Sequence, residues 1–214
     1  AFHQRPGFRH PLTNDELYRR LGLVMSVKVE ATIEDLLKVD QKAEIVNGEI
    51  LIMSPTGSLP GYAAAEIFSS LREYSKRRKS GRAVTDNNAF VVNLPYRKSF
   101  SPDAAFYVGM DSGMKFYQGA PVFAAEVRSE GDYGPRAERA MAAKRDDYFA
   151  AGTLVVWDVD LLSDDVVRVY RASDPQRATI YRRGQIAEVE PAVPGWSMPV
   201  EDLFPEDLSR GSHG

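Results

Sequence analysis

Three short apolar segments decide the fold: SPDAAFYVG at residues 101–109, VFAAEVRS at 122–129 and LVVWDVD at 154–160. Such runs, bounded by turn-forming residues, predict buried strands. Between the second and third lies a segment that begins with Pro135, a favoured first residue of a helix, and continues through Ala151. Strands and helices alternating in this way predict an α/β protein with a mixed sheet and helices packed against it.

Two of these segments carry an acid, Asp103 in the first and Glu126 in the second. A buried carboxylate without a partner is costly, and a divalent cation shared between neighbouring strands would remove that cost. Alternation places each acid on the same face as an alanine, Ala105 or Ala124, which leaves room for an ion. Paired strands lie about 4.8 Å apart, so the two carboxylates could hold one hard cation such as Mg²⁺. The carbonyl of Val127 is a candidate third ligand.

The helix that follows Glu126 adds a lysine. Lys144 lies on the same helical stripe as Met141 and Tyr148, which we expect to face the core. An ammonium group on an inward stripe requires an anionic partner, and the two strand acids supply one. A lysine beside a metal-held water can position that water or stabilise the charge that develops when a phosphate is attacked.

Each residue also has a simpler interpretation. Asp103 follows a proline and could be a turn residue, and Glu126 with Arg128 could form a half-exposed polar face. Lys144 could extend to solvent or pair with Asp147. The occurrence of all three in this order favours a common site.

Other acids and a basic cluster have similar pairs of interpretations. Glu44, at the start of a predicted hairpin, could supply a further carboxylate or be solvated, and Glu66 is a weaker candidate. Asp158 and Asp160 are predicted to be turn-forming surface acids. The basic residues 76–79 end a predicted helix, where they either complement its dipole or contact phosphates.

Length and composition bound the organisation of the chain. With 214 residues, of which 43% are hydrophobic, it can form one domain with a substantial core. We expect an N-terminal arm and short helix at residues 1–30, a single α/β domain at 31–205 and a tail at 206–214. The chain has no cysteine, which excludes disulfides and thiolate sites, and its three histidines lie at positions 3, 10 and 213, which disfavours zinc.

Charge and hydropathy restrict the partners. The net charge is −3, which weakens a simple nucleic-acid interpretation, although acids at a metal site lower the net charge while a local basic stripe can still face phosphates. No apolar run reaches the length of a membrane span and no charged-then-apolar leader is seen. We therefore expect a soluble, cytoplasmic protein that does not bind membranes.

The remaining elements follow from local signals. Thr32 and Asp35 form a capping-box pattern, as do Thr13 and Glu16 before a helix at 13–24. Asn47-Gly48 between two apolar runs predicts a hairpin with a type I′ turn. Further expectations are a helix at 62–79, a strand signal over 82–95, a hairpin made by 166–172 and 178–189, and an irregular closure at 194–204.

The ordered motifs resemble a known superfamily. SPDAAF, AEVRS and the downstream Lys144–Tyr148 pair resemble the restriction-endonuclease-like superfamily named for its PD-(D/E)xK motif. Within it, AEIVNGEILIMSPTG, AGTLVVWDVD and PGWSMPVEDLF resemble the Uma-type group of bacterial restriction-endonuclease-like proteins. The resemblance covers residues 30–205.

The resemblance implies a restriction-endonuclease-like core of order αβββαβ and Mg²⁺-dependent hydrolysis of phosphodiester bonds. It implies that Asp103 is the motif acid and Glu126 the second metal-binding acid, and that Glu44 is an additional metal ligand. Arg128 stands where the motif has lysine, and arginine cannot transfer protons. The resemblance implies that Lys144 supplies the lysine function from the helix.

Two functions are carried forward. The first is an endonuclease acting on DNA with Mg²⁺, or Mn²⁺ in its place, through Asp103, Glu126, Lys144 and Arg128, as a homodimer suited to cutting both strands. The alternative is a catalytically weak or inactive nuclease-fold module that binds nucleic acid or a protein partner, which Arg128 and the acidic composition favour. A structural role, in which Lys144 merely neutralises the acids, is the third interpretation.

Overall fold

The computed structural model describes residues 30–206. The helix predicted at 13–24 lies outside the described residues, as do most of the arm and the tail. The core is a six-stranded sheet in the order β11-β10-β9-β8-β6-β3. Its strands are β3 (Arg82–Thr85), β6 (Ala104–Tyr107), β8 (Phe123–Val127), β9 (Val155–Val159), β10 (Val167–Arg171) and β11 (Asp174–Tyr181). Strands β8 and β9 are parallel and the other pairs antiparallel, so the predicted mixed sheet is confirmed.

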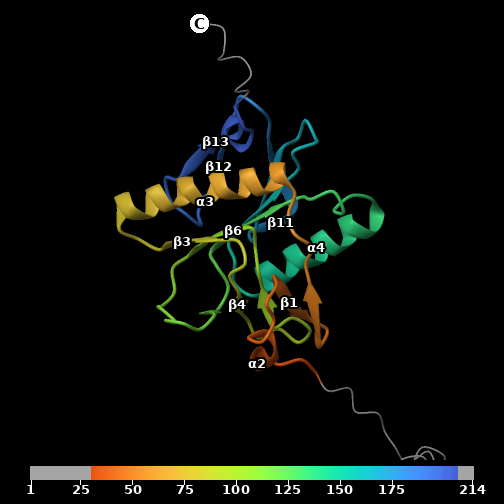
Figure 1. The fold of residues 1–214 in the computed structure, drawn as a ribbon. Coiled ribbons are helices and arrows are strands. Elements are labelled where there is room, and N and C mark those ends of the chain that lie inside the picture. The colour runs from red at the N-terminus through yellow and green to blue at the C-terminus, as the bar shows by residue number, and fades with distance from the viewer. Residues whose placement is uncertain (1–29, 207–214) are drawn as a thin grey trace, which may run out of the picture. The chain divides into compact units, whose positions relative to one another are not determined.

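Helices cover both faces of this sheet, as Figure 1 shows. Helix α3 (Ser58–Arg78) packs on the face that carries Phe106, Phe123 and Trp157. Helix α4 (Pro135–Ala150) lies on the opposite face and adds Tyr148 to a second core. Burial on both sides explains why the central strands read as nearly continuous apolar runs.

Helix α3 begins at Ser58 rather than at residue 62, because Pro60 is tolerated in a first turn where the backbone N–H has no helical partner. The helix ends at Arg78 and is capped by Lys79, which adopts a left-handed conformation with φ of 53°. Its buried side chains recur at helical spacing: Ala63, Ala64, Ile67, Leu71 and Tyr74. The helix predicted at 62–79 is therefore confirmed, with its start four residues earlier.

The N-terminal hairpin is present as predicted, with strands β1 (Ala43–Val46) and β2 (Glu49–Ile52). Asn47 and Gly48 have φ of 52° and 74°, as a type I′ turn requires. The short helix α2 (Ile33–Leu36) precedes it and has the predicted capping box. Strand β1 also pairs with a later segment, since Lys98 N–H donates to the Ile45 carbonyl at 3.0 Å. This pairing holds the hairpin beside residues 97–100.

The strand signal over 82–95 is divided into two strands in the structure. Strand β3 ends at Thr85, and β4 (Phe90–Val91) joins β5 (Ser99–Phe100) and β7 (Tyr117–Gln118) in a separate three-stranded sheet. Asn87 has φ of 58° and donates its N–H to the Asp86 side chain. Asp and Asn favour such turns, and this local chemistry outweighs the β propensity of the flanking residues.

The C-terminal region is more regular than expected. Strands β10 and β11 form the predicted hairpin, but the second predicted arm does not continue to residue 189. Instead β12 (Ile186–Glu188) pairs with β13 (Ser197–Pro199), which is followed by a 3₁₀ helix, η1 (Val200–Leu203). Gly184, with φ of 79°, forms part of the turn that separates β11 from β12. Trp196 and Met198 from this region are buried against the α3 side of the sheet.

The prediction for Asp158 and Asp160 is wrong, because both are buried, with 3% and 6% of their surface exposed. Asp158 lies within β9 and accepts two hydrogen bonds from Arg128, at 2.7 and 2.8 Å. Asp160 accepts from the Tyr133 hydroxyl at 3.0 Å. A buried charge is tolerated when it is paired and hydrogen-bonded, and these partners are distant in sequence.

Among the described helices, none combines the length and the apolar character that crossing a membrane would require.

Candidate functional site

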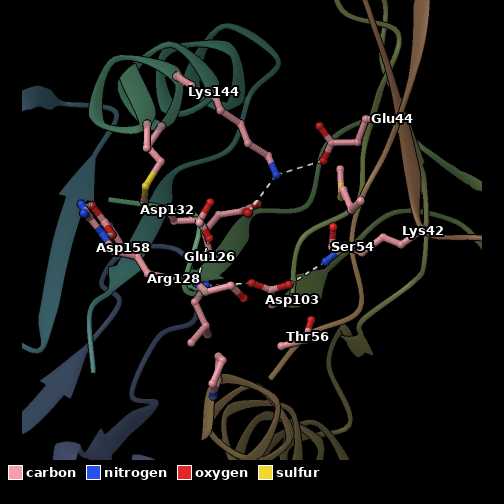
Figure 2. Close-up of a pocket in the computed structure, with 18 of the residues that line it drawn as sticks. Lys42, Glu44, Ser54, Thr56, Asp103, Glu126, Arg128, Asp132, Lys144 and Asp158 are labelled. Carbon is pink, nitrogen blue, oxygen red and sulfur yellow. Dashed lines mark hydrogen bonds and ion pairs between the residues drawn. The ribbon is translucent and has the colours of Figure 1, made fainter. Parts of the chain in front are cut away.

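The two acids of the motif meet on the α4 face of the sheet. Asp103 immediately precedes β6, and Glu126 is the penultimate residue of β8. The pairing of Ala104 with Ala125 sets this register, and the Asp103 N–H donates to the Ala125 carbonyl at 3.1 Å. Figure 2 shows both carboxylates directed into one pocket. Both side chains therefore lie on the face that alternation along the strands predicts.

Both oxygens of Asp103 accept hydrogen bonds. Lys42 Nζ donates to Oδ1 at 2.6 Å, and the Val127 N–H donates to Oδ2 at 2.7 Å. Lys42 also pairs with Asp86 at 2.6 Å. Burial acts to lower the pKa of Lys42, but the attraction of Asp103 and Glu126 is greater and raises it. Lys42 is therefore a permanent positive charge beside the motif acid.

Both oxygens of Glu126 also accept hydrogen bonds. Lys144 Nζ donates to Oε2 at 2.8 Å and the Tyr148 hydroxyl donates to Oε1 at 2.6 Å. Burial raises the pKa of Glu126, with Asp103 and Glu44 adding to the rise while Lys144 opposes it. The two acids also lie near each other, because the Val127 N–H that holds Asp103 belongs to the residue after Glu126. A cation shared between them would relieve the repulsion between their charges.

Lys144 bridges the sheet and the hairpin. Besides Glu126 it pairs with Glu44 Oε1 at 3.0 Å, as Figure 2 shows. The Ser101 N–H also donates to Glu44 Oε1, at 2.8 Å. Although burial opposes it, attraction to Lys144 and Arg97 lowers the pKa of Glu44. Burial likewise disfavours charge on Lys144, but Glu126 and Glu44 raise its pKa, so Lys144 stays protonated at neutral pH.

A buried arginine anchors Glu44 from behind. Arg97 contacts Glu44 Oε2 at 2.5 Å and Asp147 Oδ2 at 2.6 Å. Its guanidinium lies 4.9 Å from the centre of the Phe100 ring, and Phe100 stacks on Tyr148 with ring centres 4.0 Å apart. The segment after β4, α4 and the hairpin are thereby joined through one buried group of charges.

Arg128 is engaged on the β9 side of the site. It forms a bidentate pair with Asp158 and a second ion pair with Glu138 of α4. The hydrogen bonds that it donates to Asp158, together with those to Glu138, raise the pKa of Arg128. With 4% of its side chain exposed, Arg128 is committed to these two carboxylates.

These residues line a cavity of about 940 Å³. Its walls are the loop and helix start at residues 53–60, the turn at 129–132 and the inward face of α4, including Ala137 and Met141. The charged groups on its surface are Lys42, Glu44, Arg97, Asp103, Glu126, Arg128, Glu130, Asp132, Lys144, Arg145 and Asp158. A volume of this size is at the upper end of those found for small-ligand sites.

The structure thus brings together Asp103, Glu126, Lys144 and Glu44, and places Arg128 and Val127 beside them. Sequence reasoning missed Lys42, Arg97 and Asp86 among the partners of these residues. Lys42 could have been found by alternation, since it lies two residues before Glu44 on the same face of the hairpin. Asp86 lies in a bend and Arg97 in an isolated bridge with Val46, and neither position carries a periodic signal in the sequence.

The donor set fits a hard divalent cation in its chemistry. Carboxylate and carbonyl oxygens are the ligands that Mg²⁺ prefers. The N–H and carbonyl of one strand residue point to the same edge, so the Val127 carbonyl faces the side on which its N–H meets Asp103. Within residues 30–206, however, no three or more His, Cys, Asp or Glu side chains are gathered closely enough to form a metal cluster. Lys42 and Lys144 neutralise the acids instead.

Comparison with known proteins gives the family. The Uma2 family model, described as "Putative restriction endonuclease", matches residues 31–201. The chain belongs to the Uma2 family. For this Uma2 chain, the family resemblance inferred from the motifs is therefore confirmed. The family description supports a nuclease function.

The fold of this Uma2 chain is similar to that of a solved structure described as a "putative nuclease belonging to DUF820" from Anabaena variabilis ATCC 29413. The TM-score is 0.63 at 18% identity, with 81% of this chain and 97% of that chain covered. At this identity the match establishes the nuclease-like α/β fold alone. The search among curated proteins returned no match for this chain.

Proposed function

We propose that this Uma2 chain is a divalent-metal-dependent endonuclease that hydrolyses phosphodiester bonds in DNA. The observation that carries the proposal is the meeting of Asp103, Glu126 and Lys144 at one pocket, with Lys144 Nζ 2.8 Å from Glu126. Family membership supports a nuclease function, and the resemblance to the PD-(D/E)xK motif implies that these positions are catalytic. The catalytic unit is the domain of residues 31–205.

Mg²⁺, or Mn²⁺ in its place, would be held by Asp103 and Glu126, with the Val127 carbonyl and Glu44 as further ligands, and would supply Lewis-acid polarisation and an activated water. Around it, the Val127 N–H and Tyr148 hydroxyl hold the two acids in fixed orientations. Preorganised ligands of this kind avoid reorganisation when charge develops.

Lys144 acts as a positive charge. Because its pKa is raised, it stays protonated and is suited to stabilising the negative charge that develops on the phosphate rather than to removing a proton. Glu44 fixes Lys144 from the opposite side at 3.0 Å. We assign Arg128 a positioning role, because its guanidinium is bound to Asp158 and Glu138 and thereby holds β8 in place.

The direct test is cleavage of supercoiled plasmid with Mg²⁺ or Mn²⁺. We expect Asp103→Asn and Glu126→Gln to abolish metal-dependent cleavage, and Lys144→Met to reduce it by about 100-fold. Glu201→Gln is the matched control, because this acid is half exposed and pairs with Arg183 outside the pocket. Circular dichroism confirms folding of each variant. Cleavage that persists in Asp103→Asn, or that does not require a metal, would contradict the proposal.

One observation favours the non-catalytic alternative. Each of the four oxygens of Asp103 and Glu126 already accepts a hydrogen bond within the protein. A module that binds DNA or a protein partner without cutting could keep such a neutralised site. Binding of labelled duplex DNA by the wild-type chain, with no cleavage in either metal and none with single-stranded DNA or RNA, would favour this alternative.

We further propose that the protein works in the cytoplasm as a homodimer, an arrangement suited to cutting both strands of a duplex. Sedimentation of the purified chain, alone and with a DNA duplex, tests the dimer. A monomer under both conditions would contradict it.

A further inference from the structure

Lys42 lies between one carboxylate inside the candidate site and another outside it. Its Nζ is 2.6 Å from Asp103 Oδ1 and 2.6 Å from Asp86 Oδ1. The side chains differ in exposure: 13% for Asp103, 14% for Lys42 and 40% for Asp86. The ammonium group therefore has a buried partner within the site and a second, more exposed partner at its margin.

The hairpin determines where Lys42 lies. The Met53 N–H donates to the Lys42 carbonyl at 2.9 Å, which extends the pairing of β1 and β2 by one step. Lys42 and Met53 line both the main cavity and a neighbouring one of about 500 Å³, whose wall also includes Asp86. Lys42 thus stands at the boundary of two cavities, with one carboxylate on each side.

Both oxygens of Asp103 accept hydrogen bonds, but only Oδ1 has a partner that could move aside for an external cation. The backbone N–H of Val127 fixes Oδ2, while Oδ1 is held by the end of a long lysine side chain. A divalent cation bound to Oδ1 and an ammonium group at 2.6 Å from the same oxygen would repel each other strongly in a partly buried site. Lys42 has to leave Asp103, and Asp86 is already in contact to receive it.

We propose that Lys42 is a built-in counter-ion that occupies the cation position on Asp103 and transfers to Asp86 when a divalent cation binds. The inference rests on the proposed function for the metal, and goes beyond it by assigning two residues that tune metal affinity. Asp86 is a positioning residue that acts through Lys42.

Direct titration with Mn²⁺, by calorimetry and by the electron paramagnetic resonance signal of the free ion, tests this transfer without any cleavage assay. We expect Lys42→Met to bind Mn²⁺ at least about 5-fold more tightly than wild type. This is the lower end of the coupling usually found between two ligands. Asp86→Asn should weaken binding, because Lys42 then has Asp103 as its remaining partner. The double variant should match Lys42→Met, since Asp86 acts through the lysine.

Two controls make the result specific. Lys38→Met removes a charge from a lysine that is 73% exposed and pairs with Asp35, and should leave Mn²⁺ affinity unchanged. Lys42→Gln serves as the second variant should Lys42→Met fail to fold, as judged by circular dichroism and urea unfolding.

The outcomes separate this inference from the proposed function. Unchanged or weaker Mn²⁺ binding in Lys42→Met or Lys42→Gln overturns the counter-ion role, as does an equal effect of Asp86→Asn with and without Lys42. If the counter-ion role fails but wild type binds Mn²⁺ and Asp103→Asn does not, the proposed function still stands. Absence of Mn²⁺ binding in every variant overturns both.

Discussion

Tyr148 joins an aromatic contact and a polar one in a single fully buried side chain. Its ring stacks on Phe100, and its hydroxyl donates to Glu126 at 2.6 Å. Burial, with the nearby Glu126 and Glu44, raises the pKa of Tyr148 well above its ordinary value, so the hydroxyl remains a donor over the working pH range. The residue fixes the orientation of the acid without changing charge itself.

Tyr148→Phe keeps the stacked ring and removes the donor. Because hydrogen bonds to charged groups are worth about 1.5–3 kcal/mol, we expect the free energy of unfolding to fall by about 2 kcal/mol in urea titrations. Tyr107→Phe is the control, since this buried hydroxyl donates at 2.6 Å to a neutral carbonyl of Gln118 and should cost about 1 kcal/mol. Equal losses in the two variants would argue against an ionised Glu126.

Arg128 depends on the planar geometry of its guanidinium group. Arg128→Lys keeps the charge but cannot form the bidentate pair with Asp158 and the pair with Glu138 together. We expect a loss of about 1–3 kcal/mol in the free energy of unfolding, because buried acids would be left partly unpaired. Arg183→Lys, at an exposed pair with Glu201, should change stability little. If Arg128→Lys leaves the free energy of unfolding unchanged, the bidentate pair with Asp158 is not needed for stability.

At the scale of elements, the turn from α3 to β3 depends on a glycine that packs against an aromatic ring. Gly81 has φ of 62°, and a Cβ there would lie 2.2 Å from the Phe106 ring. Phe106 is itself buried and packs edge-on against Tyr74 of α3. The close approach of backbone and ring closes this end of the helix onto the sheet.

Gly81→Ala and Gly113→Ala form a matched pair. Gly113 has φ of 60°, but a Cβ added there would have nothing within 4 Å, so its substitution carries the conformational cost alone, about 1 kcal/mol. Gly81→Ala adds the clash with Phe106, and we expect a total of about 2–4 kcal/mol. Thermal or urea unfolding measures both. Similar losses would mean that the ring can move aside.

The elements that follow periodic signals were predictable from the sequence. The stripe of α3, the Asn47-Gly48 turn and the Pro135 start of α4 all rest on local chemistry. The separation of β4 and β12 from the longer predicted strands, and the presence of β13, were not predictable, because runs of two or three residues carry no period. Their pairing depends on residues distant in sequence.

For the whole molecule, the buried charges set the response to alkaline pH. The pKa values of Lys42, Lys144, Tyr148 and Tyr133 are all raised on folding, that of Tyr133 to about 12. Above the ordinary values near 10, the folded state therefore holds more protons than the unfolded state. The free energy of unfolding must then fall as pH rises.

We expect urea midpoints to be lower at about pH 11 than at about pH 8. Lys144→Met and Tyr148→Phe should each flatten this dependence, because each removes one proton-binding difference. Lys38→Met is the comparison, since Lys38 is largely exposed. A pH dependence that is the same in all of these variants would place its origin outside the site.

The candidate site was only half predictable. The periodicity of β8 and of α4 was enough to predict that Glu126 and Lys144 lie together, as they do in the structure. The environment of Asp158 was mispredicted, because its partner Arg128 lies on another strand and no local pattern reports such pairing. Arg97 was missed for the same reason, since it reaches Glu44 across 53 residues of sequence, whereas alternation with Glu44 could have found Lys42.

The hairpin that carries Lys42 and Glu44 is not part of the six-stranded sheet, and this separation has a consequence for the order of folding. Lys42 is 61 residues from Asp103 along the chain, and Glu44 is 57 from Ser101. Longer loops cost more entropy to close, so we expect these contacts to form after the more local pairing of β6 with β8. Contacts that form after the rate-limiting barrier govern how quickly a native protein opens. We therefore expect the lifetime of the assembled pocket to depend on how long the hairpin stays docked.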